Sequence, residues 1–209
     1  MPENCLRHEP QLHYEKFNNH KPLTLITVGT LDGRKNNILL LKSISLMSHK
    51  TDIRLNIVGN GPLEKSLKKY VLNNNLEEIV TFHGKLTREE VGALFKTSHL
   101  NILTSIMEGN PTVVWEAMEA GVPTLSLDHC GMHDTVTSTA GFPIKIDIEE
   151  HLIQSIADTI DMICENPNIL IEKAQNVINE ASKYLWPERR KKFNQLYKIA
   201  IDNFNRKKS

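Results

Sequence analysis

The sequence has little of what marks a secreted, membrane-spanning or nucleic-acid-binding protein. Its three cysteines, Cys5, Cys130 and Cys164, are odd in number and lack CxxC spacing, which argues against a disulfide framework. No apolar run approaches the roughly 20 residues of a transmembrane helix, and the N-terminus has no signal-peptide pattern. The 25 basic residues balance the 25 acidic ones, so the net charge indicates neither nucleic acid nor an anionic membrane as a partner. We therefore expect a cytoplasmic globular protein with reduced thiols.

Aromatic residues are also scarce, at 6% of the chain, whereas aliphatic ones form short runs separated by stretches with helical spacing. Strands are expected at 23–28, 53–58, 79–82, 100–103, 123–127 and 142–146. Helices are expected at 36–47, 62–72, 88–96, 111–120, 149–165, 167–184 and 187–205. This alternation predicts an α/β fold, a Rossmann-like, doubly wound parallel sheet of about six strands with helices on both faces and extra C-terminal helices. Residues 1–21 are interpreted as a lead-in or linker, 22–205 as the domain and 206–209 as a tail.

The unusual residues follow the predicted strands, at the edge where open parallel sheets bind ligands. Glu108 and Glu116 stand eight positions apart, across a turn and the start of a helix. Asn110 is expected as the N-cap and Pro111 as the first helical residue, so that the amides after them remain open to an anion or a sugar oxygen. The Glu116 side chain would lean towards the same opening and could accept two hydroxyl hydrogen bonds. The alternative is that Glu108 is a loop charge and Glu116 a solvated helix residue.

Three further turns lie on the same predicted edge. After the first strand, Gly29 and Gly33 would permit close backbone approach, and Arg34 and Lys35 suggest a phosphate between them; a solvated basic turn is the alternative. Gly59-Asn60-Gly61 follows the second strand but lacks the third glycine of a dinucleotide fingerprint, so a tight structural turn is the simpler interpretation. His83-Gly84 comes directly after the expected third strand, where its backbone could contact a nucleobase.

Two other segments have simpler explanations. His129, Cys130 and His133 crowd together after the fifth strand, but the two histidines would converge on a metal only in a helix, which Gly131 disfavours. A Cys130–His nucleophilic pair lacks a third, orienting group, so a polar sugar-facing loop is favoured. In the last helix the apolar residues are expected to form a packing face and the basic run 189–192 to be solvated.

In their order along the chain, VGTLDGRKN, VGNGP, FHGKL and EGNPTVVWEAMEAGVP resemble the C-terminal, donor-binding domain of a GT-B glycosyltransferase of family 4 (glycosyl transferases group 1) over roughly residues 22–205. The resemblance implies transfer of a sugar from a nucleotide-diphospho-sugar with retention, in polysaccharide or glycoconjugate biosynthesis, with no metal and no other cofactor. It implies a catalytic role for Glu108 at the sugar and Lys35 at the diphosphate, and ribose binding by Glu116. The other donor-binding positions that it implies are Gly29, Thr30, Arg34, Gly59, Asn60, His83, Gly84, Leu86, Gly109, Asn110, Pro111, Thr112 and Val113.

The sequence departs from the family pattern at Thr30, where an arginine is common, and at Asn110-Pro111, where Phe-Gly is common. The resemblance also implies a partner, an N-terminal acceptor domain, without which this chain would be inactive and through which the protein could associate with the inner face of the membrane. A non-catalytic nucleotide- or sugar-binding module or subunit is the main alternative. A structural protein with a degenerate site and a nicotinamide-dependent oxidoreductase are two others, and the latter is disfavoured by the incomplete glycine fingerprint.

Overall fold

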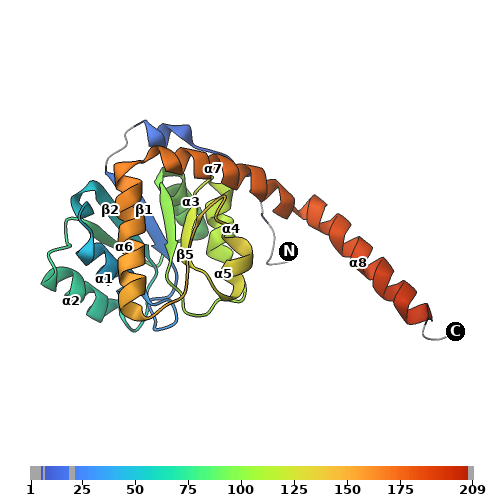
Figure 1. Cartoon of the computed structure of the whole chain (residues 1–209), viewed down its shortest axis with the longest axis horizontal. Helices are drawn as coiled ribbons and strands as arrows, with labels where there is room; N and C mark the ends of the chain where they lie inside the picture. The colour runs from blue at the N-terminus through green and yellow to red at the C-terminus, as the bar shows by residue number, and fades with distance from the viewer. Residues whose placement is uncertain (1–5, 7, 19–21, 207–209) are drawn as a thin grey trace.

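The computed structural model describes residues 6, 8–18 and 22–206, which form a six-stranded parallel sheet with helices on both faces (Figure 1). The strand order is β3-β2-β1-β4-β5-β6, and each neighbouring pair is parallel. The order reverses at β1, as expected for a doubly wound sheet, so the predicted fold class is confirmed. The strands are β1 (Leu23–Val28), β2 (Ile53–Val58), β3 (Val80–Gly84), β4 (Leu100–Leu103), β5 (Thr124–Leu127) and β6 (Phe142–Ile144).

Each face of the sheet buries a separate apolar cluster, which explains why the strands are hydrophobic on both sides. One face is covered by α1 (Asn37–Leu46), α2 (Glu64–Asn73) and α6 (Glu149–Glu165). The opposite face is covered by α3 (Arg88–Thr97), α4 (Thr112–Glu119) and α5 (Cys130–Thr135). The helix α7 (Asn168–Ala181) contributes buried residues to both clusters and so ties the two layers together.

Most predicted elements are present, and the differences lie at their ends. The third strand was expected to end at Phe82 but continues to Gly84, because the Gly84 carbonyl accepts a hydrogen bond from the Gly59 amide at 2.8 Å. A further helix, α5, occupies a segment for which a loop was expected. The predicted capping box of α3 is confirmed: the Thr87 hydroxyl accepts from the Glu90 amide, and the Glu90 carboxylate accepts from the Thr87 amide.

The N-terminal segment lies against the domain, across the end of the sheet where the strands begin (Figure 1). It contains the 3₁₀ helix η1 (Tyr14–Phe17), whose Phe17 is buried in the core. Upstream, Gln11 donates its amide hydrogen to the Glu119 carbonyl, and Leu6 forms a parallel bridge with Leu185. These contacts fix the described part of the segment on the same body as the sheet.

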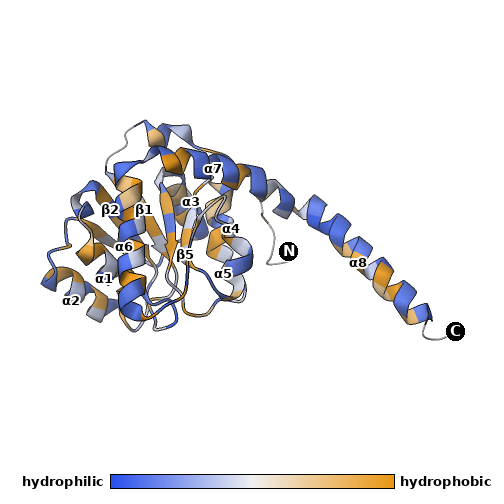
Figure 2. Ribbon diagram, in the orientation of Figure 1, coloured by the Kyte–Doolittle hydropathy of each residue, from blue (hydrophilic) through white to orange (hydrophobic). Residues whose placement is uncertain are grey.

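After α7 and η3 (Ser182–Tyr184), the 21-residue helix α8 (Trp186–Arg206) extends away from the body, as Figure 1 shows. Hydrophobic and hydrophilic residues both lie along its length (Figure 2). None of its residues is buried, and its apolar side chains are exposed, so the expected packing face has no cover among the described residues. Within residues 6, 8–18 and 22–206, no helix is both long and apolar enough to cross a membrane.

Candidate functional site

The loops after β1 and β4 meet at the carboxyl edge of the sheet, where they bring together three of the predicted site residues. The Glu108 carboxylate accepts hydrogen bonds from the ammonium of Lys35 and, at 3.3 Å, from the guanidinium of Arg34. Glu108 is only 7% exposed, although it stands in a loop. A carboxylate is buried at this depth only when it is paired, so the two cations account for its position.

The backbone of the β1–α1 turn is held so that Lys35 and Arg34 face the β4–α4 loop. The Lys35 amide donates to the Asp32 carboxylate at 3.0 Å, and the Thr104 hydroxyl lies 3.1 Å from the Lys35 carbonyl. The Ile106 amide donates to the Arg34 carbonyl at 2.9 Å, which joins the two loops directly. Sequence reasoning missed Asp32 and Thr104, although a carboxylate three residues before an amide is typical of a local turn.

The glycines of this edge have different roles. Gly59 has a φ of +128°, and a Cβ atom there would lie 1.9 Å from the Gly29 carbonyl oxygen, so the close approach of the two turns requires glycine. At Gly29 a Cβ atom would lie 2.8 Å from the Lys35 Cε atom, so its absence leaves room for the lysine stem. At Gly33 no atom lies within 4 Å of such a Cβ position, so the close approach of a ligand expected there stays a prediction.

The start of α4 also differs from the prediction. Pro111 is the N-cap and Thr112 the first helical residue, whereas Asn110 was expected to cap the helix. The Asn110 side-chain oxygen instead accepts a hydrogen bond from the Trp115 indole at 2.9 Å, which occupies it. The first amides of a helix have no intrahelical acceptor, so this end of α4 keeps its capacity for an anion or a sugar oxygen. Thr112 and Gly109 are exposed beside it, and Val113 is buried.

Glu116 lies further along α4, where its carboxylate is 3.4 Å from the Arg88 guanidinium of α3. The side chain is 27% exposed, against 8% for Glu108. Burial raises the pKa of the Glu116 carboxyl and Glu119 adds to the rise, while Arg88 opposes it. Glu116 is thus partly desolvated with one long ion pair, a suitable state for accepting hydroxyl hydrogen bonds. Sequence reasoning did not identify Arg88, which lies 28 positions away on another helix.

The short helix α5 supports the Glu108 loop, although Gly131 was expected to disfavour a helix in this segment. The Gly131 amide donates to the Glu108 carbonyl at 2.7 Å. A Cβ atom on Gly131 would lie 2.8 Å from that oxygen and 2.6 Å from the Gly109 carbonyl oxygen. Glycine is therefore needed for α5 to approach the loop, and any larger residue would displace the backbone that carries Glu108.

The remaining predicted donor-binding positions line the same edge without a shown role. His83 Nε2 lies 2.8 Å from the Asn56 side-chain oxygen, so this ring is directed back at the sheet. Gly84 adopts a φ of +66° at the end of β3, and Leu86 is half-buried against the α3–α4 side of the core. Thr30 and Asn60 are exposed. The contacts of these residues with a ligand stay predictions.

The residues after β5 pair with each other. His133 Nδ1 lies 2.7 Å from the Asp128 carboxylate, and this hydrogen bond raises the pKa of the His133 imidazole. The described part of the chain holds no group of three or more histidine, cysteine, aspartate or glutamate residues placed to bind a metal ion. The sugar-facing role predicted for this loop stays a prediction.

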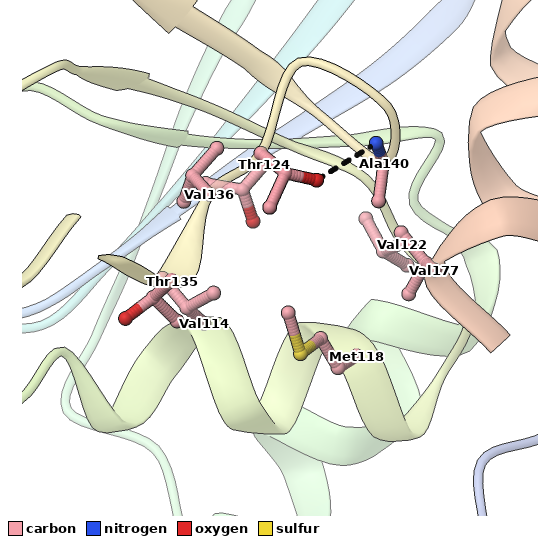
Figure 3. A pocket seen from close by; sticks show the side chains of 9 residues that line it. Val114, Met118, Val122, Thr124, Thr135, Val136, Ala140 and Val177 are labelled. Atoms are coloured by element: carbon pink, nitrogen blue, oxygen red, sulfur yellow. Dashed lines mark hydrogen bonds between the residues drawn. The ribbon is translucent and has the colours of Figure 1, made fainter. Parts of the chain in front are cut away.

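A small apolar pocket lies away from these residues, between α4, β5 and α7 (Figure 3). Its volume of about 10 Å³ is that of a single water, and its lining includes the apolar side chains of Val114, Met118, Val122 and Val177. It is a gap in packing, and the candidate site lies instead at the Lys35–Glu108 edge.

Comparison with known proteins supports the glycosyltransferase part of the assignment made from the motifs. The family model described as glycosyl transferases group 1 matches residues 9–184. The amylovoran biosynthesis glycosyltransferase AmsK of Erwinia amylovora is 27% identical over 135 residues, which are 58% of this chain and 33% of that protein. An uncharacterized glycosyltransferase of Haemophilus influenzae is 29% identical over 152 residues, which are 71% of this chain and 41% of that protein. The chain spans about a third to two fifths of the length of these relatives.

Solved structures share the fold at low identity. The pneumococcal O-GlcNAc transferase GtfA, in complex with UDP and GlcNAc, superposes with a TM-score of 0.78 at 19% identity, covering 94% of this chain and 38% of that one. Anabaena Alr3699/HepE, in complex with UDP and glucose, gives 0.72 at 18% identity, covering 88% of this chain and 51% of that one. These likenesses show the fold, and the family model covers most of the sequence. The chain belongs to the glycosyl transferases group 1 family.

Proposed function

We propose that this chain is the C-terminal, donor-binding part of a retaining GT-B glycosyltransferase of family 4, and that its ligand is a nucleotide-diphospho-sugar. The convergence of Lys35, Arg34 and Glu108 at the carboxyl edge carries the proposal. Two cations and a carboxylate at one point match a ligand that joins an anionic diphosphate to a hydroxyl-rich sugar. Both GtfA and HepE were solved with UDP and a sugar, which supports the same ligand class here.

Binding would exchange one set of contacts for another. The diphosphate oxygens would take over Lys35 and Arg34, and Glu108 would then be free to accept hydrogen bonds from the sugar. Glu116, eight residues on, would accept the ribose hydroxyls, and the first amides of α4 would face the ligand between the two glutamates.

The same cations account for the chemistry proposed for this part of the enzyme. As the bond between sugar and diphosphate breaks, negative charge grows on the leaving group, and Lys35 and Arg34 would stabilise it without a metal. Glu108 would hold the sugar in position for the reaction. The acceptor would come from an N-terminal domain, so we expect the 209-residue chain alone to bind the donor but not to transfer sugar. Relatives named for amylovoran and colanic acid biosynthesis support a role in polysaccharide synthesis. We propose that the protein acts in the cytoplasm at the inner face of the membrane, and that the acceptor domain makes any membrane contact.

Calorimetric titration of the folded chain with UDP, GDP and their hexose conjugates tests the proposal. At least one nucleotide-sugar should bind, and Lys35→Met should weaken its binding about tenfold or more, as the loss of a charge-assisted contact predicts. Lys69→Gln, which changes an exposed lysine of α2, should leave the affinity unchanged. Absence of nucleotide-sugar binding by a folded chain would overturn the proposal. Donor binding without transfer by the full-length protein would favour the non-catalytic module instead.

A further inference from the structure

A second concave surface lies at the opposite end of the sheet, where the strands begin. It encloses about 600 Å³, within the usual range for small-molecule sites. It is formed by η1, the start of β1, the end of α3 and the residue before β4. We call it the amino-end groove. Its polar lining residues are His13, Glu15, Lys16, Thr24, Lys96, Thr97 and His99.

The wall of the amino-end groove is held rigidly by His99, which is 5% exposed. Its Nδ1 accepts a hydrogen bond from the Thr24 amide at 2.9 Å, so the ring proton is on Nε2, which donates to the Lys16 carbonyl at 2.6 Å. The Phe17 ring packs on the imidazole edge-to-face, with the centroids 5.6 Å apart. His99 thus fixes η1 on the starts of β1 and β4, and the groove is preformed.

The charges of the amino-end groove are predominantly positive. Lys16 and Lys96 both line it, and neither has a carboxylate partner among the described residues. His13 lies close enough to both that burial and these two ammonium groups lower the pKa of its imidazole. Glu15 is the one acidic residue of the described lining.

Lys16 is the most constrained of these groups. Its ammonium donates a hydrogen bond to the Ala120 carbonyl at 3.4 Å and lies over the Phe17 ring, whose centroid is 5.3 Å away. Burial lowers the pKa of Lys16 to about 8. A desolvated ammonium without a counter-charge is unfavourable, and an anion in the groove would relieve that cost.

We propose that the amino-end groove is a second ligand site, which binds the phosphate group of a small sugar phosphate independently of the candidate donor site. Lys16 and Lys96 bind the phosphate oxygens from two sides of the groove. The volume is larger than a phosphate alone requires, and the Glu15 carboxylate and the Thr97 hydroxyl can accept hydrogen bonds from sugar hydroxyls. The site does not depend on nucleotide-sugar binding, because its residues lie at the opposite ends of the strands from Lys35 and Glu108.

Thermal denaturation and calorimetry of the whole chain with three probes test this site: inorganic phosphate, a hexose 6-phosphate and the free hexose. At a concentration ten times its dissociation constant, the hexose phosphate should raise the melting temperature by about 3–5 °C. Inorganic phosphate should bind at least tenfold more weakly, and the free hexose should cause no shift. Equal affinities for hexose phosphate and inorganic phosphate would overturn the sugar assignment.

Variants then locate the site. Lys16→Met keeps the length of the side chain and removes the charge, so it should raise the melting temperature of the free protein and abolish the shift with hexose phosphate. Lys96→Gln should weaken binding about tenfold, whereas Lys69→Gln and Lys35→Met should preserve it. Binding that survives Lys16→Met, or that Lys35→Met abolishes, would overturn the proposal. The outcome with Lys35→Met also separates this site from the donor site, whose proposed function would stand in either case.

Discussion

The two ends of the sheet both present buried or half-buried lysines, but only one end neutralises them. At the carboxyl end Lys35 and Arg34 share the carboxylate of Glu108. At the amino end Lys16 is desolvated beside a carbonyl and an aromatic ring, with no carboxylate partner in the described chain. One lysine of this domain is therefore neutralised by a carboxylate, whereas the other keeps an unneutralised charge.

The difference indicates how each end would respond to an anion. At the carboxyl end an anionic ligand has to replace an existing ion pair, so part of its binding energy is spent on separating Lys35 from Glu108. At the amino end an anion meets an unneutralised charge and relieves its desolvation. Mutations that break the first arrangement should destabilise the free protein, and mutations that remove the second charge should stabilise it.

The largest effect is expected for Glu108→Gln. It removes the counter-charge from Lys35, whose side chain is only 14% exposed, and breaking a buried ion pair in this way costs about 3–5 kcal/mol. Urea denaturation at pH 7 should therefore show a lower midpoint with an unchanged slope. The exposed Glu78→Gln serves as the matched control and should leave the midpoint within about 0.5 kcal/mol of the wild type.

The double variant Lys35→Met/Glu108→Gln shows whether the loss is electrostatic. Removing the lysine charge together with the carboxylate should restore much of the stability, since the one cation then left without Glu108 is the half-exposed guanidinium of Arg34. If the double variant is as unstable as the sum of both single variants, the ion pair does not stabilise the loop junction.

A smaller effect of opposite sign is expected for Lys16→Met. The pKa of Lys16 falls from 10.5 to about 8 on folding, so between these pH values the unfolded chain binds more protons than the folded one. The stability contributed by this group is therefore lowest below pH 8 and rises as the pH rises towards 10.5. Lys16→Met should be about 1–2 kcal/mol more stable than the wild type at pH 7, and the advantage should vanish by about pH 10.5. Chemical denaturation at a series of pH values measures it, and a constant difference across the series would contradict the charge as its cause.

The fold could be predicted from the sequence because each local signal agreed with the others. Short apolar runs marked four of the six strands to within one residue, and Thr87 with Glu90 marked the start of α3. The third strand was predicted too short because its last hydrogen bond joins Gly84 to Gly59, the residue that follows β2. The sequence gives no local sign of such a bond.

The candidate site was predictable in its position but not in its pairings. The strand ends indicated which loops would meet, and they brought Lys35 close to Glu108. Three features depend on contacts between separate segments of the chain. They are the neutralisation of Glu108, the ion pair of Arg88 with Glu116, and the hydrogen bond from Gly131 to the Glu108 carbonyl. Gly131 shows the limit best, because helix propensity counts glycine as unfavourable while the close approach to the Glu108 loop requires it.

The smallest effect on stability is expected for Glu116→Gln. This variant tests whether the difference between neutralised and unneutralised charges depends on the end of the sheet at which a residue lies or on how completely a counter-charge pairs with it. Glu116 lies at the carboxyl end, yet burial raises the pKa of its carboxyl, as an incompletely neutralised charge requires. Because the folded pKa is the higher one, the stability contributed by this group is lost as the pH rises above 4.5. Glu116→Gln should therefore gain stability at pH 7 while it weakens nucleotide binding. Arg88→Gln should do the opposite to stability, since it removes the charge that opposes the rise. Denaturation and nucleotide titration of both variants measure these effects. If Glu116→Gln is less stable than the wild type, Glu116 is a neutralised residue like Glu108, and the difference in neutralisation depends on the end of the sheet.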